Sequence, residues 1–228
     1  VTSHTASLGG SRIIWEAALR QAGAIQVHSL EEMAQACLAF SLLPPRPYRG
    51  ITVAGGGGAL GVAACDMAEA YGLSLPHLEG EIYAAVLDCL PKPGSSAANP
   101  IDIANPYVPP KMIKEALLHA ARDPRVDLQI QAPLLYHFKA LSAMTGGVSF
   151  PAITPYAELA VAGREVADST GKPVVVVLPN PRRRADDMDV EEVFRRARQA
   201  FLSRGIPVFD GLAEAMRAIR NVAAFASR

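Results

Sequence analysis

The sequence lacks the features that would direct a protein to a membrane or to nucleic acid. No apolar run approaches the ~20 residues that cross a bilayer, and the opening residues are not the basic and then apolar stretch of a secretory leader. The 22 basic and 22 acidic side chains cancel, so no broad positive field favours nucleic acid or an anionic lipid surface. We therefore expect a cytoplasmic protein that acts on small molecules or protein partners.

Cysteine is also scarce. The three residues Cys37, Cys65 and Cys89 are far apart, and each lies within a helical pattern. An odd number without short-spaced pairs predicts buried thiols in a reducing compartment, and argues against disulfides or a zinc site. No metal-ligand spacing links the four histidines after the first one, so we interpret all of them as structural or surface residues: His28, His77, His119 and His137.

What the sequence does contain is enough apolar material for a substantial core. Half of the residues are hydrophobic and 19% are charged, which is typical of a globular protein. The one basic cluster, Arg182 to Arg184, is followed at once by acidic residues, which favours a solvated loop over a nucleic-acid patch.

The N-terminal part is predicted to be helical. Ser11 can cap a first helix that ends at Gly23, and Ser29 with Glu32 forms a capping-box pattern for a second. The proline-rich Leu43-Pro44-Pro45-Arg46-Pro47 cannot continue a regular element, so we interpret it as a linker.

Beyond this linker, short β-branched runs alternate with amphipathic stretches. The predicted strands are 51–54, 101–103, 128–131, 174–178 and 206–209, and the predicted helices are 58–71, 80–89, 110–121, 155–169, 189–204 and 211–226. This alternation predicts an α/β fold with a doubly wound, mostly parallel sheet. The run 174–178 is apolar at every position, as expected of a strand covered on both faces.

The strongest local signal is a strand that turns through four glycines directly into a helix. Glycines allow close backbone approach, and a helix start offers unpaired N–H groups, so this turn suits a phosphate. It lacks the Lys-Ser/Thr of a P-loop, and its spacing does not match the dinucleotide fingerprint. A tight turn without a ligand is the alternative. The candidate phosphate-binding residues are Gly55, Gly56, Gly57, Gly58, Ala59, Leu60 and Gly61.

His4 is the candidate catalytic residue. It lies in a loop of small residues ahead of a helix, where an imidazole can be presented to a partner site and act as a nucleophile in phosphoryl transfer. From the residues alone, an ordinary polar surface histidine is the alternative.

Asn99 and Asp102 flank a short predicted strand in Asn99-Pro100-Ile101-Asp102. Such side chains can fix a loop by hydrogen bonds to the backbone, and strand ends are where open α/β sheets place their sites. We expect both residues to be structural elements near the site, and a purely structural turn fits the pattern equally well.

The order of these features along the chain resembles the NDP-forming acyl-CoA synthetases, a family that includes ADP-forming acetyl-CoA synthetase and is related to succinyl-CoA synthetase. The resemblance runs nearly the whole length and is carried by Ser3-His4-Thr5, Leu8-Gly9-Gly10, the segment 20–25, the glycine turn, Asn99-Pro100-Ile101-Asp102, Lys172-Pro173-Val174 and the segment 205–209. Ala6 and Ser7 differ from the Gly and Ala usual in that family, and its turn is more often of an Asn-Ser-Gly-Gly type.

The resemblance implies a function through a phosphohistidine. In the family, a histidine matching His4 is phosphorylated by an acyl phosphate formed from acyl-CoA and passes the phosphoryl group to ADP or GDP. The glycine turn matches one of two helix N-termini that point at the phosphohistidine. The alternative is a non-catalytic α/β interaction or regulatory domain, or a degenerate homologue, that binds a partner or an anion.

The resemblance also implies a domain organisation. Residues 1–43 would be the C-terminal remnant of the phosphohistidine domain, and 44–228 a flavodoxin-like domain. A CoA-binding domain and a nucleotide-grasp domain, on the same chain or other subunits of a homo- or hetero-oligomer, would complete the enzyme. CoA, ADP/ATP or GDP/GTP, Mg²⁺ and a small acyl substrate would bind in the full enzyme, with no cofactor or metal held by this chain alone.

Overall fold

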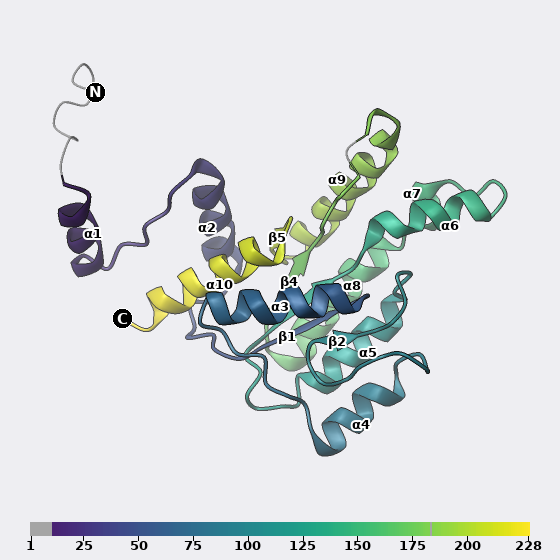
Figure 1. Ribbon diagram of the computed structural model, residues 1–228, viewed down its shortest axis with the longest axis horizontal. Helices are drawn as coiled ribbons and strands as arrows, with labels where there is room; N and C mark the ends of the chain where they lie inside the picture. The colour runs from purple at the N-terminus through teal and green to yellow at the C-terminus, as the bar shows by residue number, and fades with distance from the viewer. Residues whose placement is uncertain (1–10, 183) are drawn as a thin grey trace.

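The computed structural model describes residues 11–182 and 184–228. Five parallel strands form one sheet in the order β2-β1-β3-β4-β5 (Figure 1). They are β1 (Ile51–Gly55), β2 (Ile101–Asp102), β3 (Leu128–Ala132), β4 (Val174–Val177) and β5 (Val208–Phe209). This is the doubly wound order of flavodoxin-like folds, so the predicted fold class is confirmed.

Helices follow the strands and cover both faces of the sheet (Figure 1). The α-helices are α1 (Arg12–Gln21), α2 (Leu30–Leu42), α3 (Gly58–Ala70), α4 (Gly80–Asp88), α5 (Pro110–Ala120), α6 (Phe138–Met144), α7 (Phe150–Ile153), α8 (Tyr156–Thr170), α9 (Met188–Leu202) and α10 (Leu212–Ala226). Two short 3₁₀ turns, η2 (Leu135–His137) and η3 (Ala185–Asp187), precede α6 and α9. None of the helices among the described residues is both long and apolar enough to cross a membrane.

The core lies on the two sides of the sheet. Ile51 and Val53 of β1 belong to a buried cluster with α2, α3 and α10, whereas Val174 and Val176 of β4 belong to a cluster with α4, α5, α8 and α9. Side chains alternate across a strand, so successive residues serve opposite faces. Every residue of β4 is buried, as the continuous apolar run predicts.

The capping signals at the N-terminus have different outcomes. Ser29 accepts a hydrogen bond from the Glu32 N–H at 3.0 Å, as predicted, but the Glu32 carboxylate accepts from the N–H of His28 at 2.6 Å and not from that of Ser29. The first helix begins directly after Ser11, whose side chain makes no capping hydrogen bond.

The segment predicted as a linker packs against the α/β body. Leu43 and Tyr48 are buried, and the Tyr48 hydroxyl donates to the Pro44 carbonyl at 2.7 Å. Just ahead of it, α2 packs on α10, where the rings of Phe40 and Phe225 meet edge to face at 5.5 Å. The proline-rich segment is irregular, as expected, yet it lies on the domain surface as a fixed part of it.

The structure differs from the sequence predictions in two respects. Cys37 and Cys65 are exposed, and only Cys89 is partly buried, so the prediction of buried thiols was wrong for the first two. A helical pattern does not specify which side chains face outward, because that depends on how the helix docks. The helices α6 and α7, inserted between β3 and α8, were also not predicted.

Candidate functional site

The glycine turn lies where β1 ends and α3 begins, at the carboxyl edge of the parallel sheet. Gly57 caps α3 with φ 106°, a backbone conformation that side chains disfavour, so glycine is required there. Gly57, Gly58 and Ala59 are exposed, whereas Leu60 and Gly61 are half-buried. The turn therefore presents the first residues of a 13-residue helix to solvent.

The two glycines at the start of the turn serve contacts within the protein. A Cβ on Gly55 would lie 2.6 Å from the Ala132 carbonyl oxygen, and one on Gly56 would lie 2.8 Å from that of Asn105. Both residues are buried. Close approach of backbone to backbone, and not to a ligand, explains these two glycines.

Asp102, at the end of β2, fixes the turn. Its Oδ1 accepts from the Gly57 N–H at 2.9 Å and from the Ala104 N–H at 2.8 Å. The other carboxylate oxygen would be 3.8 Å from a Cβ on Gly58. Asp102 thus ties the ends of β1 and β2 together and places a negative charge beside the start of α3.

Asn99 is a buried structural residue next to the site. Its Oδ1 accepts from the Val53 N–H at 3.1 Å, and its Nδ2 donates to the carbonyls of Ile51 and Pro76, each at 3.0 Å. The side chain completes the backbone pairing of β1 where β2 is too short to do so. With three hydrogen bonds and 7% exposure, Asn99 is not available to a ligand.

The N–H groups of Gly58 and Ala59 remain for an anion. Residues in the first turn of a helix lack intrahelical acceptors, and no described side chain accepts from these two. Leu60, the next residue, already donates its N–H to the Gly57 carbonyl at 3.1 Å. The helix dipole favours a negative group at this end, so the exposed start of α3 can bind a small anion.

The candidate catalytic residue has no described position, and the other histidines were expected to be structural or surface residues. His4 lies outside the described residues. His77 is exposed 4.0 Å from a Glu79 oxygen, and His137 lies beside the Tyr136 ring, where burial and then the charge of Arg182 lower the pKa of its imidazole. Within 11–182 and 184–228, no group of three or more potential ligands is arranged to hold a metal.

The sequence interpretation named Asp102 but missed the way it acts. The Asp102 carboxylate accepts from the N–H of Ala104, two residues later in the chain, which forms an Asx-type turn. The sequence signal for such a turn is an Asp at the end of a strand. Its second bond, to Gly57, joins residues 45 positions apart and has no local signal.

Comparison with known proteins shows what this chain is similar to. Residues 1–40 match the family described as "Succinyl-CoA ligase like flavodoxin domain". The ADP-forming acetate–CoA ligase of Methanocaldococcus jannaschii is 33% identical over 107 residues, which are 47% of this chain and 15% of that protein. The alpha subunit of ADP-forming acetate–CoA ligase II from Pyrococcus furiosus is 28% identical over 209 residues, which are 91% of this chain and 40% of the subunit.

Solved structures show the same fold over almost the whole chain. Dinucleotide-forming acetyl-coenzyme A synthetase 1 of Candidatus Korarchaeum cryptofilum, in complex with phosphate and ADP, has a TM-score of 0.75 and 24% identity, and the match covers 99% of this chain and 43% of that one. The chain thus spans less than half the length of the relatives it matches. Taken with the matching sequence order from residue 1 onward, these similarities support the resemblance of the chain to the NDP-forming acyl-CoA synthetase family.

Proposed function

We propose that the chain is part of an NDP-forming acyl-CoA synthetase, in which the start of α3 stabilises a phosphoryl group carried by His4. The enzyme would interconvert acyl-CoA, NDP and phosphate with carboxylic acid, CoA and NTP. The observation that carries this proposal is the exposed N-terminus of α3, where the N–H groups of Gly58 and Ala59 are unengaged by the described residues.

The proposed chemistry needs a nucleophile and an anion cradle. A ring nitrogen of His4 attacks the phosphorus of an acyl phosphate, the bond from phosphorus to the acyl oxygen breaks, and the carboxylate leaves. The phosphoryl group then moves from the imidazole to the terminal oxygen of an NDP. Between these steps the phosphohistidine is anionic, and fixed N–H dipoles stabilise such a group without reorganisation.

The seven predicted residues contribute unequally to this cradle. Gly58 and Ala59 offer the N–H groups, and Gly57 supplies the backbone conformation that turns β1 into α3. Gly55 and Gly56 allow the turn to pack, while Leu60 and Gly61 belong to the first turn of the helix. Asp102 opposes an incoming anion electrostatically and holds the turn in shape.

We propose that the remaining functions come from other parts of the enzyme. CoA, the nucleotide with Mg²⁺ and the small acyl substrate would bind chiefly to CoA-binding and nucleotide-grasp domains or subunits, in a cytoplasmic homo- or hetero-oligomer. Residues 1–43 would then continue a phosphohistidine domain and 44–228 would be the flavodoxin-like domain. The matches to subunits and to longer chains support the presence of further domains or subunits.

The test is phosphorylation of the enzyme assembled with these parts. Incubation with γ-labelled ATP should give an acid-labile, alkali-stable label, and His4→Ala should abolish it. His77→Ala is the matched control, because His77 is exposed and far from the turn in sequence. Absence of label on the assembled wild-type protein would support the alternative, an α/β interaction or regulatory domain that keeps the fold without catalysis.

A further inference from the structure

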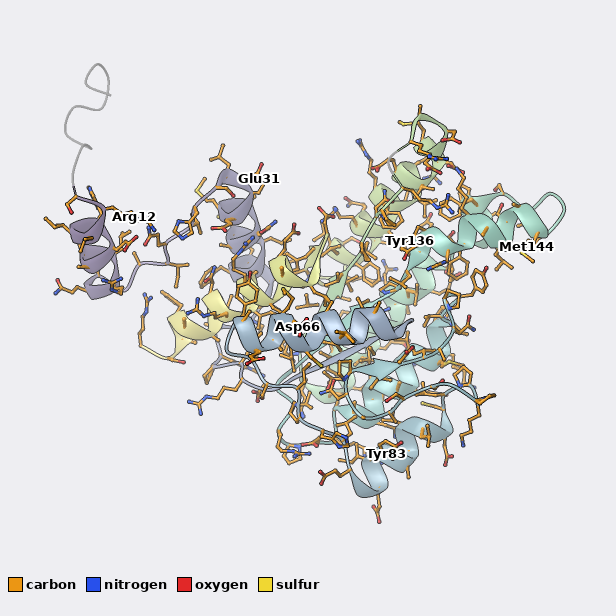
Figure 2. The ribbon with its side chains drawn as sticks, in the orientation of Figure 1. Arg12, Glu31, Asp66, Tyr83, Tyr136 and Met144 are labelled. Atoms are coloured by element: carbon orange, nitrogen blue, oxygen red, sulfur yellow. The ribbon has the colours of Figure 1, made fainter. Side chains whose placement is uncertain are left out.

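A cavity opens at the carboxyl edge of the sheet, on the side of β4 and β5. It has a volume of about 880 Å³, within the range of small-molecule sites. Its walls come from the segments that follow β3, β4 and β5 and from one side of α9, so it shares no residue with the glycine turn. Figure 2 shows Tyr136, one of its lining residues, in the region between α9 and the insertion of α6 and α7.

The acidic groups that line this cavity already have partners. Glu191 of α9 accepts a hydrogen bond from the Asn180 side-chain amide at 2.8 Å. Asp210, which follows β5, pairs with Arg198, and this guanidinium also donates to the Val208 carbonyl at 3.0 Å. Each carboxylate is thus neutralised or hydrogen-bonded within the wall.

Two arginines that line the same cavity are not engaged in this way. Arg184, at the start of η3, and Arg195, on α9, make no ion pair or side-chain hydrogen bond with the part of the chain that the structure describes. With Arg198, the lining carries three cations against two carboxylates. The uncommitted positive charge favours an anionic ligand, because a guanidinium binds phosphate or carboxylate through paired N–H groups.

The rest of the wall is apolar and aromatic. Phe194 of α9 is nearly buried, and Met188 at the start of that helix is 67% exposed while lining the cavity. Two prolines, Pro179 and Pro181, flank Asn180 in the segment after β4. An exposed methionine facing a cavity with an aromatic floor suits the apolar body of a ligand.

We propose that this cavity binds a small organic anion, a phosphate ester or carboxylate with an apolar or aromatic body. Arg184 and Arg195 bind the charged group, and Met188, Phe194 and Tyr136 contact the body. None of its residues belongs to the glycine turn, so substitutions in this cavity leave the residues of the proposed anion cradle unchanged.

Calorimetric titration of the 228-residue chain at low ionic strength tests this site with three probes: phenyl phosphate, benzoate and inorganic phosphate. We expect phenyl phosphate or benzoate to bind about ten-fold more tightly than inorganic phosphate, because only the organic anions bury an apolar body. Tighter binding of phenyl phosphate would assign a phosphate ester, and tighter binding of benzoate would assign a carboxylate.

Variants locate the binding. Arg184→Ala and Arg195→Ala should each weaken the preferred organic anion about ten-fold, as expected for loss of a charged hydrogen bond. Met188→Ala should weaken the organic anion and leave inorganic phosphate unchanged. The matched control is Arg122→Ala, an exposed arginine beyond the end of α5, which should change neither affinity. Undetectable binding of both organic anions, or binding that Arg184→Ala and Arg195→Ala leave unaltered, would overturn the proposal, whatever the outcome at His4.

Discussion

At the scale of single residues, the positions that most constrain this fold lie where strands start or end. Gly50, just ahead of β1, is the clearest case: a Cβ there would lie 1.8 Å from the Arg125 carbonyl oxygen. Its N–H and that of Arg49 donate to the Asp127 carboxylate at 2.9 and 2.8 Å, which ties the start of β1 to the start of β3.

Gly50→Ala should therefore destabilise the protein by about 3 kcal/mol, because backbone must move to admit the methyl group. Urea unfolding measures this change. Gly58→Ala is the same substitution at a helical position with ordinary space, the nearest atom being 3.8 Å away, and it should alter the free energy of unfolding by less than about 1 kcal/mol. Equal effects of the two variants would contradict the steric explanation.

Buried polar side chains in this protein differ in whether they have hydrogen-bond partners. Asn99 makes three hydrogen bonds, whereas Gln129 and Gln131 of β3 and Thr52 of β1 have fully buried polar atoms without a protein partner among the described residues. Thr52 and Gln129 are register partners, and Gln131 lies two residues further along β3 on the same face of the sheet. Uncompensated buried polar groups are costly unless ordered water pairs with them.

We expect opposite results from removing the two kinds of amide. Asn99→Ala should cost about 2 kcal/mol or more, since it leaves the buried Val53 N–H unpaired, whereas Gln131→Met should be close to neutral or stabilising. Thermal and urea unfolding of both variants provide the comparison. A large loss of stability for Gln131→Met would show that water or a neighbour satisfies that amide well.

At the scale of elements, Asp102 joins β1, β2 and α3 through two N–H groups. Asp102→Ala should destabilise the protein by about 1 to 2 kcal/mol, as loss of a capping acceptor does, while Asp102→Asn keeps an oxygen acceptor and should cost less. Urea denaturation of the two variants ranks these effects. If Asn were as damaging as Ala, charge and not the acceptor geometry would be the important property.

A second connection between elements is the ion pair of Asp187 with α6. The Asp187 carboxylate is nearly inaccessible and lies 3.0 Å from Lys139 Nζ and 3.5 Å from an Arg182 guanidinium nitrogen. The Lys139 hydrogen bond and the two positive charges lower the pKa of this carboxyl. It links the α6 and α7 insertion to the start of α9.

The lowered pKa predicts how stability depends on pH. A carboxyl whose pKa is lower in the folded state contributes stability above its unfolded pKa of about 4, and this contribution is lost as pH falls through the folded pKa. Asp187→Asn should therefore destabilise the protein at pH 7, and the difference from wild type should shrink in acid. Urea unfolding across this range is the measurement. Asp66→Asn, which alters an exposed carboxylate of α3 (Figure 2) that has no ion pair among the described residues, is the matched control.

At the scale of the whole molecule, the N-terminal helices behave differently from each other. No residue of α1 is buried, and Ile13 and Ile14 are 76% and 70% exposed. In Figure 1, α1 lies away from the sheet, whereas α2 lies against α10. Arg217 of α10 forms an ion pair with Glu32 of α2 at 3.0 Å and donates a hydrogen bond to the Gln35 side-chain oxygen at 2.7 Å.

Truncation tests where the folded unit begins. Removing residues 1–22 should change the free energy of unfolding by no more than about 0.5 kcal/mol, because no described side chain of that segment is buried. Removing residues 1–43 should cost about 3 kcal/mol or more, since Ala36, Ala39 and Leu43 leave the core. Unchanged stability after the longer truncation would show that the packing of α2 on α10 contributes little to the stability of the α/β body.

Local sequence determined the secondary structure of this protein to a large extent. The β-branched runs and the amphipathic stretches between them predicted all five strands and the helices between them except α6 and α7, because period and β-propensity are properties of neighbouring residues. Pro207 shortened the last strand to Val208–Phe209, although its carbonyl still accepts from the Val176 N–H. The glycine run likewise predicted the turn between β1 and α3.

Only the tertiary structure decided what these local features contact. It assigned Gly55 and Gly56 to packing against protein, left Gly58 and Ala59 open, and brought Asp102 to Gly57 across 45 positions. It also left Cys37 and Cys65 exposed to solvent, and it placed Arg184 and two arginines of α9 around one cavity. Such outcomes depend on the docking of distant segments, and a contact between residues far apart in the chain leaves no periodic pattern in the sequence by which to predict it.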